Sequence, residues 1–166
     1  MTVYEKLIKQ QYDRGFNDAR DLRSRAPELD GTQVIAEEIK IPRFDSTKDY
    51  SSWIVGSPVK YNSQIYKLLQ PYNAANYEGT PSTLPALWSI CHTTDPYKAK
   101  PFMAPNGTSG MYMIGECCTE NGKTYKSLVD NNVYAPSAYL QNWEEVDFEA
   151  LEAEATEVQE EVGDNQ

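Results

Sequence analysis

The chain lacks the features that mark membrane-spanning, exported and nucleic-acid-binding proteins. No apolar run approaches the roughly 20 residues that cross a bilayer. The N-terminus also lacks the apolar segment that is typical of a signal peptide. We therefore expect no membrane partner, and synthesis in the cytoplasm without a signal peptide. No cluster of Lys and Arg interleaves with aromatic residues, which argues against nucleic acid as a partner.

Catalytic signatures are missing as well. The sequence holds no P-loop, no GxGxxG and no HExxH motif. Its acidic residues concentrate near the C-terminus, and no pair of carboxylates suited to glycoside hydrolysis can be discerned. We predict that the chain is not an enzyme and that it needs no cofactor.

Cysteine and histidine are scarce, with three Cys and one His in 166 residues. Cys91-His92 and Cys117-Cys118 total four potential zinc ligands, but neighbouring residues on a strand point to opposite sides. A Cys–His nucleophile pair would also lack an identifiable Asn or Asp to orient it. We expect no metal site and interpret these residues as small buried side chains. One disulfide, between Cys91 and either Cys117 or Cys118, stays open as an alternative.

Charge is unevenly distributed along the chain. The formal net charge is −10, and ten of the 25 acidic residues lie between Glu144 and Asp164, where no basic residue occurs. The remaining 15 acidic residues balance the 15 Lys and Arg, so the rest of the chain is neutral. The acidic run is typical of a solvated helix face.

Helical signals stand at both ends. Thr2 and Glu5 have the spacing of a capping box, apolar residues recur with helical period, and Pro27 sets the end, so we predict a helix over residues 2–25. A second helix is predicted over residues 147–162. Its apolar stripe is too short to hold alone, so it needs a surface: its own body, the N-terminal helix or a sister subunit. The stripe consists of Phe148, Leu151, Ala155, Val158 and Val162.

A pattern that occurs twice organises the middle of the chain. Gly, Asn, Tyr and Lys positions in 56–67 recur at an offset of 59 in 115–126, and each copy ends at a tryptophan, Trp88 or Trp143. Each copy is predicted to be a short hairpin followed by a loop and a third strand. Asn121-Gly122 is a strong two-residue turn signal. The predicted hairpin strands are 58–61 with 64–69, and 117–120 with 123–128.

These signals predict an α+β fold with six segments. The hairpins and third strands would form two tandem three-stranded antiparallel modules between the terminal helices. The connector can also hold one short strand at 33–41. The segments are an N-terminal helix (1–26), a connector (27–49), a first module (50–92), a linker (93–110), a second module (111–146) and an acidic C-terminal helix and tail (147–166).

Both copies resemble the carbohydrate-binding module family 5/12, a small chitin-binding fold. The resemblance covers about half of the chain. In the first copy it is carried by Trp53, Gly56, Val59, Tyr61, Asn62, Tyr66, Pro81 and Trp88. In the second copy it is carried by Tyr112, Gly115, Asn121, Gly122, Tyr125, Pro136 and Trp143.

The resemblance implies binding of a chitin-like or cell-wall polysaccharide by flat rings that stack on sugars. Twelve Tyr and three Trp against four Phe fit such a surface. The family's exposed aromatics are replaced here by Leu68-Leu69-Gln70 and Ser127-Leu128-Val129, and each terminal tryptophan is either a core residue or a ligand platform. The predicted carbohydrate-binding residues are Trp53, Tyr72, Tyr77, Trp88, Tyr134, Tyr139 and Trp143.

The wider layout is similar to small structural proteins of prophages from Gram-positive gut bacteria. The similarity is carried by the runs at 29–32, 39–42, 84–96 and 107–115. It implies a tail or head accessory protein in the virion, extracellular after host lysis, with other phage structural proteins as partners. We expect a homo-oligomer, with a trimer as one candidate. The alternative is a decoration protein whose modules mediate subunit contacts and bind no sugar.

Overall fold

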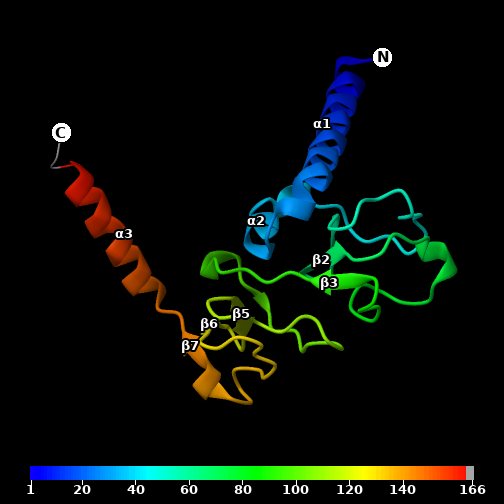
Figure 1. Cartoon of the computed structure of the whole chain (residues 1–166). Helices are drawn as coiled ribbons and strands as arrows, with labels where there is room; N and C mark the ends of the chain where they lie inside the picture. The colour runs from blue at the N-terminus through cyan, green and yellow to red at the C-terminus, as the bar shows by residue number, and fades with distance from the viewer. Residues whose placement is uncertain (164–166) are drawn as a thin grey trace.

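Two helices flank two small sheets in the computed structural model, which describes residues 1–163 and the side chains of residues 1–158 (Figure 1). The fold is mixed α+β, with a three-stranded antiparallel sheet and a four-stranded mixed sheet. The predicted α+β fold class is confirmed. Residues 164–166 of the predicted tail lie outside the described residues.

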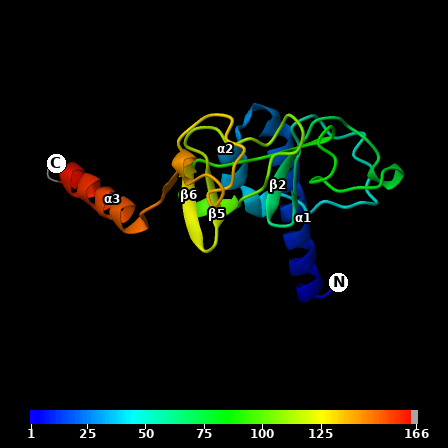
Figure 2. The ribbon, with the colours of Figure 1, turned by 90° about the horizontal axis from the view of Figure 1, so that it is seen from below.

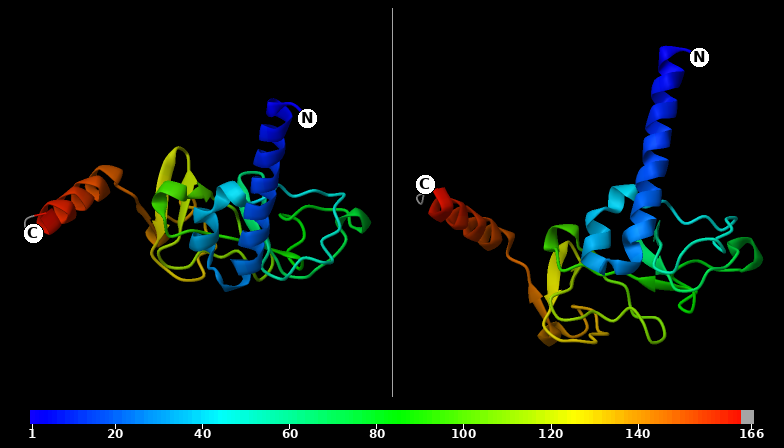
Figure 3. Two further views of the ribbon diagram at one scale, coloured as in Figure 1. Left: turned by 90° about the horizontal axis from the view of Figure 1, so that it is seen from above. Right: turned by 45° about the horizontal axis from the view of Figure 1, so that its top comes forward.

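Helix α1, Val3–Arg25, begins at the predicted capping box. The Thr2 hydroxyl accepts a hydrogen bond from the Glu5 amide at 3.1 Å, and the Glu5 carboxylate accepts one from the Thr2 amide at 2.6 Å. The helix projects from the body along most of its length (Figure 3). Of its side chains, all of which the structure describes, Leu22 alone is buried. Tertiary packing therefore holds only the C-terminal end of α1.

The segment after α1 is helical, so the predicted strand at 33–41 is wrong. It consists of η1 (Ala26–Glu28), α2 (Gly31–Ala36) and η2 (Glu38–Lys40). Asp30 and Gln33 form a second capping box, which starts α2. This capping box gives the segment a helical start, which the strand prediction did not take into account.

The turn of α2 packs closely on the backbone of His92, and glycine at position 31 makes this contact possible. A Cβ atom on Gly31 would lie 2.3 Å from the His92 carbonyl oxygen, whereas one on Gly15 in α1 would meet nothing within 4 Å. We expect Gly31→Ala to lower the free energy of unfolding by about 1–3 kcal/mol through overpacking. Gly15→Ala is the matched control and should raise it by about 1 kcal/mol. Urea denaturation followed by circular dichroism measures both; a gain in both variants would contradict the close contact.

The first sheet has the order β1-β2-β3, with β1 at Pro58–Tyr61, β2 at Gln64–Leu68 and β3 at Trp88–Ile90. Asn62 and Ser63 join β1 to β2 with φ values of 46° and 62°, as a tight hairpin turn requires. Arg43 adds a short parallel bridge to Lys60, outside the named strands. The predicted strands of the first hairpin are confirmed.

The second sheet has the order β4-β5-β6-β7. Its strands are β4 (Lys100–Pro101), β5 (Cys117–Glu120), β6 (Lys123–Ser127) and β7 (Trp143–Glu145). Strand β4 pairs in parallel with β5, and the other pairs are antiparallel. The stretch predicted as a linker therefore contributes a fourth strand. The remaining elements are η3 (Ala74–Asn76), η4 (Pro96–Lys98), η5 (Leu140–Asn142) and α3 (Phe148–Gly163).

Each sheet has its own aromatic core. In the first, the ring of Tyr50 meets Trp88 edge to face at 5.4 Å and stacks on Phe44 at 5.9 Å. In the second, Tyr112 meets Trp143 at 5.2 Å and stacks on Phe102 at 5.4 Å. These arrangements suit the ring quadrupoles. A third, aliphatic cluster joins α1 and α2 to β2; it consists of Leu22, Val34, Ile35, Ile41, Ile65 and Cys91.

Candidate functional site

Three of the seven predicted carbohydrate-binding residues lie in the cores. Trp88 is 1% exposed, Trp143 4% and Tyr72 6%. The indole Nε1 of Trp88 donates a hydrogen bond to the Tyr72 hydroxyl at 2.8 Å, and that of Trp143 donates to the Tyr134 carbonyl oxygen at 2.9 Å. Because a sugar stacks only on an accessible ring face, these three residues are corrected to core residues.

Trp53 is half-buried, and basic side chains lie over its ring. The guanidinium of Arg23 lies 4.5 Å from the ring centroid and the ammonium of Lys48 lies 5.2 Å from it. Tyr50 packs edge-on against the same ring at 4.8 Å. Cation–π contacts of this kind anchor a side chain, so Trp53 belongs to the junction between α1 and the first sheet.

Three predicted residues, Tyr77, Tyr134 and Tyr139, are exposed. Tyr77 packs edge-on against Tyr72 at 5.2 Å. Tyr134 and Tyr139 lie together, with ring centroids 5.7 Å apart and planes inclined at 46°. The structure therefore leaves one accessible ring beside the first sheet and one inclined pair beside the second.

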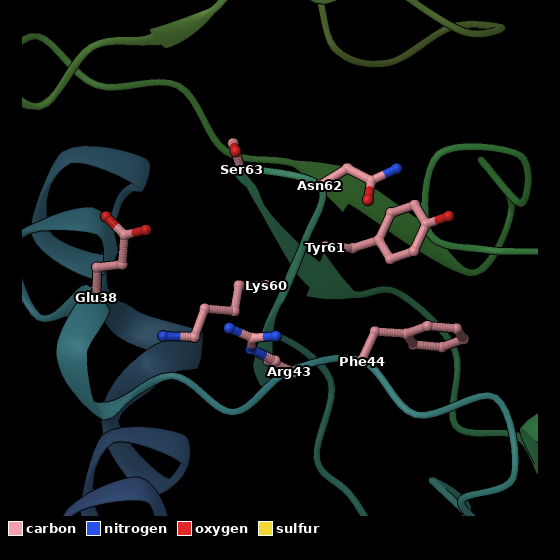
Figure 4. Close-up of a pocket in the computed structure, with 7 residues that line it drawn as sticks. All are labelled: Glu38, Arg43, Phe44, Lys60, Tyr61, Asn62 and Ser63. Atoms are coloured by element: carbon pink, nitrogen blue, oxygen red, sulfur yellow. The ribbon is translucent and has the colours of Figure 1, made fainter.

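A hollow on the surface lies elsewhere, where the connector runs along the outer edge of β1 (Figure 4). It is a cavity of about 500 Å³. The backbone builds it: the Lys60 amide donates to Pro42 O and the Phe44 amide donates to Lys60 O, each at 2.9 Å. These bonds hold the connector against β1. The lining residues are Glu38, Arg43, Phe44, Lys60, Tyr61, Asn62 and Ser63.

Two basic side chains enter this cavity from neighbouring segments. The parallel bridge between Arg43 and Lys60 sets their side chains next to each other, and Figure 4 shows both charged ends on the same side of the ribbon. Glu38, the carboxylate of the lining, is paired with Lys100 at 2.5 Å. Neither Arg43 nor Lys60 forms an ion pair with any side chain in the described part of the chain. The cavity therefore offers uncompensated positive charge.

Aromatic rings stand beside these charges. Tyr61 is half-buried and packs edge-on against Phe44, with ring centroids 6.0 Å apart. Asn62, at the hairpin turn, adds an exposed amide next to Tyr61 (Figure 4). A planar guanidinium and an ammonium hold a carboxylate or phosphate, and a phenol ring offers a face to an apolar sugar surface. The cavity thus combines the groups that bind an acidic sugar.

The second sheet lacks this combination. At the offset of 59, Thr119 and Glu120 stand where the first sheet has Lys60 and Tyr61. The Glu120 carboxylate accepts bonds from the Ser137 amide and hydroxyl, at 2.7 and 3.0 Å. A cationic site is therefore particular to the first sheet.

The sequence interpretation missed Arg43 and Phe44 because they come from the connector. Nothing in its periodicity shows that residues 43 and 44 align with β1. A signal was available in the first repeat, where Lys60, Tyr61 and Asn62 place a cation, a ring and an amide in succession.

The cysteines show no reactive arrangement. All three are free and buried, and burial raises the pKa of the Cys91 and Cys118 thiols to about 12. The disulfide considered for Cys91 is not formed. Over the residues that the structure describes, no group of three His, Cys, Asp or Glu side chains could hold a metal ion.

Across residues 1–163, no helix has the length and apolar character that crossing a bilayer demands.

No protein-family model matches the chain, and no curated protein matches it either. A function for the chain is therefore proposed from the geometry of its sites.

Proposed function

We propose that the protein is a non-catalytic glycan-binding accessory protein of a phage or prophage particle, and that its ligand binds beside β1. The observation that carries this proposal is that Arg43 and Lys60, which form no ion pair with the side chains that the structure describes, line a cavity of about 500 Å³ next to the Tyr61 ring. The ligand is an acidic cell-wall polysaccharide: its carboxylate or phosphate meets the cations, and its sugar ring lies on Tyr61.

The same proposal treats the two sheets as copies of one module. The Gly56 amide donates to Leu68 O at 2.7 Å, and at the offset of 59 the Gly115 amide donates to Ser127 O at 2.8 Å. Both glycines have positive φ, 93° and 87°, which favours glycine. These paired features support a duplication in which the first copy carries the cationic site.

Binding at one shallow site is weak, so the particle gains adhesion from many copies. Identical sites held on one particle raise the effective concentration of ligand at each other's position. This favours a place in the virion, outside the cell after host lysis, with other phage structural proteins as partners.

Binding of the full chain to immobilised polymers tests this function. We use polygalacturonate and a wall teichoic acid as acidic polymers and chitin as the neutral one. The wild type should be retained on an acidic polymer, and retention should fall as salt rises. Arg43→Glu/Lys60→Glu should weaken binding about ten-fold or more, and Tyr61→Ala about five-fold.

The matched control for charge is Lys6→Glu/Arg14→Glu, which changes the net charge by the same amount on the exposed face of α1. It should bind as the wild type does. Tyr77→Ala tests the exposed loop ring in the same assay. If Arg43→Glu/Lys60→Glu and the control lost the same amount of binding, net charge alone would explain the loss, and the proposed site would be contradicted.

A decoration protein that binds no sugar is the second candidate. It is favoured by the burial of Trp88, Trp143 and Tyr72, which removes three of the predicted platforms from the surface. Failure of the wild type to bind any acidic or neutral polymer would select this candidate.

A further inference from the structure

We propose that helix α3 of one copy of this protein docks into a basic-rimmed groove between α1 and the first sheet of a second copy. This inference is independent of glycan binding. It identifies the interface through which copies of the chain associate.

The groove is an apolar hollow of about 410 Å³ along the C-terminal half of α1. Gly15 opens it, since no atom lies within 4 Å of the place where its Cβ would stand. Phe16 is 53% exposed on one side and Ile39 92% exposed on the other. Such exposure of large apolar side chains in one hollow is typical of a contact surface.

Basic side chains surround this hollow. Arg23, Lys40 and Lys48 all line it. Lys40 is paired with Glu37 at 2.6 Å, whereas Arg23 and Lys48 lie over the Trp53 ring and have no ion pair with the side chains that the structure describes. An occupant with an apolar face and acidic flanks would therefore match the groove in both respects.

Helix α3 has these two properties. Its exposed apolar side chains include Leu151 and Val158, at 37% and 62%, on one helical face. Five acidic residues and no basic one lie between positions 147 and 158. An isolated helix of this length is marginal in water, so α3 gains stability from a partner surface.

The α3 of the same copy stands away from this groove. Helix α1 leaves the body beside α2 and the first sheet, whereas α3 leaves it beyond β7 and points outward in every view (Figures 1 and 2). At its base, Phe148 packs on Tyr97 with ring centroids 5.0 Å apart, which directs α3 off the second sheet. A second copy is therefore the occupant, and reciprocal exchange of α3 would close a dimer.

Sedimentation velocity on the full chain tests this interface over a range of concentrations. The wild type should form a species larger than a monomer. Leu151→Asp/Val158→Asp should weaken association about ten-fold or more by placing charge in the apolar contact. Ala153→Asp/Thr156→Asp adds the same charge on the opposite face of α3 and is the matched control, which should associate as the wild type does. Circular dichroism should show that each of these chains keeps a cooperatively folded body, with a lower melting temperature only for the variant that loses association.

A mixing experiment separates this arrangement from pairing between two α1 helices. Phe16→Asp damages the groove and should also give monomers. Equimolar mixing of the Phe16→Asp chain with the Leu151→Asp/Val158→Asp chain leaves one intact groove and one intact α3, so heterodimers should form. A wild type that is monomeric at every concentration would overturn the proposal. Association that survives the α3 variant would also overturn it.

Discussion

Trp88→Ala is expected to lower the free energy of unfolding by about 3–5 kcal/mol, the cost of truncating a buried large aromatic residue. The indole is 1% exposed and lies edge-on to Tyr50 and Phe44. Its removal leaves a cavity and also strips the buried Tyr72 hydroxyl of its hydrogen-bond donor. Because a small domain has about 5–15 kcal/mol of stability in all, this variant should be partly unfolded at physiological temperature.

Two matched variants show whether the loss of stability in Trp88→Ala comes from the place of the ring in the core or from the removal of any large aromatic side chain. Trp143→Ala should cost less than Trp88→Ala, because the acceptor it leaves behind is the part-buried backbone carbonyl of the exposed residue Tyr134, whereas Trp88→Ala leaves a buried side-chain hydroxyl without its donor. Tyr139→Ala, at a ring that is 46% exposed, should change the stability by about 1 kcal/mol or less. Chemical denaturation followed by circular dichroism avoids the loss of a fluorescent probe. A Trp88→Ala chain as stable as the Tyr139→Ala chain would show that the ring is not a core residue.

Helix α1 and the two hairpins were predicted from short sequence signals, because neighbouring residues determine where these elements begin and turn. The capping box of Thr2 and Glu5 starts α1, and the turn residues Asn121 and Gly122 adopt φ values of 51° and 77° between β5 and β6. Each signal acts through a hydrogen bond or a backbone preference within a few residues. The helix and both hairpins could therefore be read from neighbouring residues.

The placement of the aromatic rings depends on contacts between distant residues and was only partly predictable. Tyr72 was predicted to bind carbohydrate, which requires an accessible ring, but the Tyr50 amide donates to the Tyr72 carbonyl oxygen at 2.8 Å and holds that loop against the sheet. The position of Arg43 also depends on a long-range contact, because its bridge to Lys60 joins the connector to β1. A sequence-based prediction of exposure fails where long-range backbone bonds turn a loop into part of a core.

The site beside β1 combines side chains from a repeated hairpin with side chains from the connector, which is not repeated. The β1–β2 hairpin alone supplies Lys60 and Tyr61, and it has a counterpart in the second sheet that carries Thr119 and Glu120 instead. Only the connector, held by backbone bonds to β1, adds Arg43 and Phe44. Duplicated sheets can therefore share a framework while a non-repeated segment decides which one carries positive charge.

Acid should destabilise the protein through His92. The imidazole is 7% exposed, stacks on Tyr112 with ring centroids 3.7 Å apart, and its Nε2 lies 2.9 Å from the Gly110 carbonyl oxygen. Since a carbonyl only accepts, Nε2 carries the proton of the neutral ring. Burial lowers the pKa of His92 from its ordinary value of 6.5 to about 4. The folded protein therefore resists a second proton that the unfolded chain readily takes up.

The direction of the pH effect follows from this difference. Above pH 6.5 both states hold a neutral imidazole, and His92 adds no pH dependence. As the pH falls from 6.5 to 4, the unfolded chain binds more protons than the folded one, so the free energy of unfolding should drop by about 3 kcal/mol. Carboxyl groups also contribute at acid pH, with both signs. Hydrogen bonds from Thr47 and Ser51 lower the pKa of Asp45 and Asp49, so their contributions to stability are lost as acid is added. Arg25 and Lys40 lower the pKa of Glu37 to about 2, so its contribution is lost below about pH 4.5, whereas burial raises the pKa of Glu116, which stabilises the fold as acid is added.

The variant His92→Phe isolates the histidine from these carboxyl groups. Phenylalanine keeps a flat ring against Tyr112 but cannot titrate, and it leaves the Gly110 carbonyl without its donor at a constant cost of about 1 kcal/mol. Urea denaturation of both chains at pH 7.5, 6.5, 5.5 and 4.5 gives the comparison. The wild type should be the more stable chain at pH 7.5, and its advantage should shrink and then reverse as the pH falls. Parallel curves over this range would mean that His92 is solvated or already protonated in the folded protein, and the buried neutral ring would have to be abandoned.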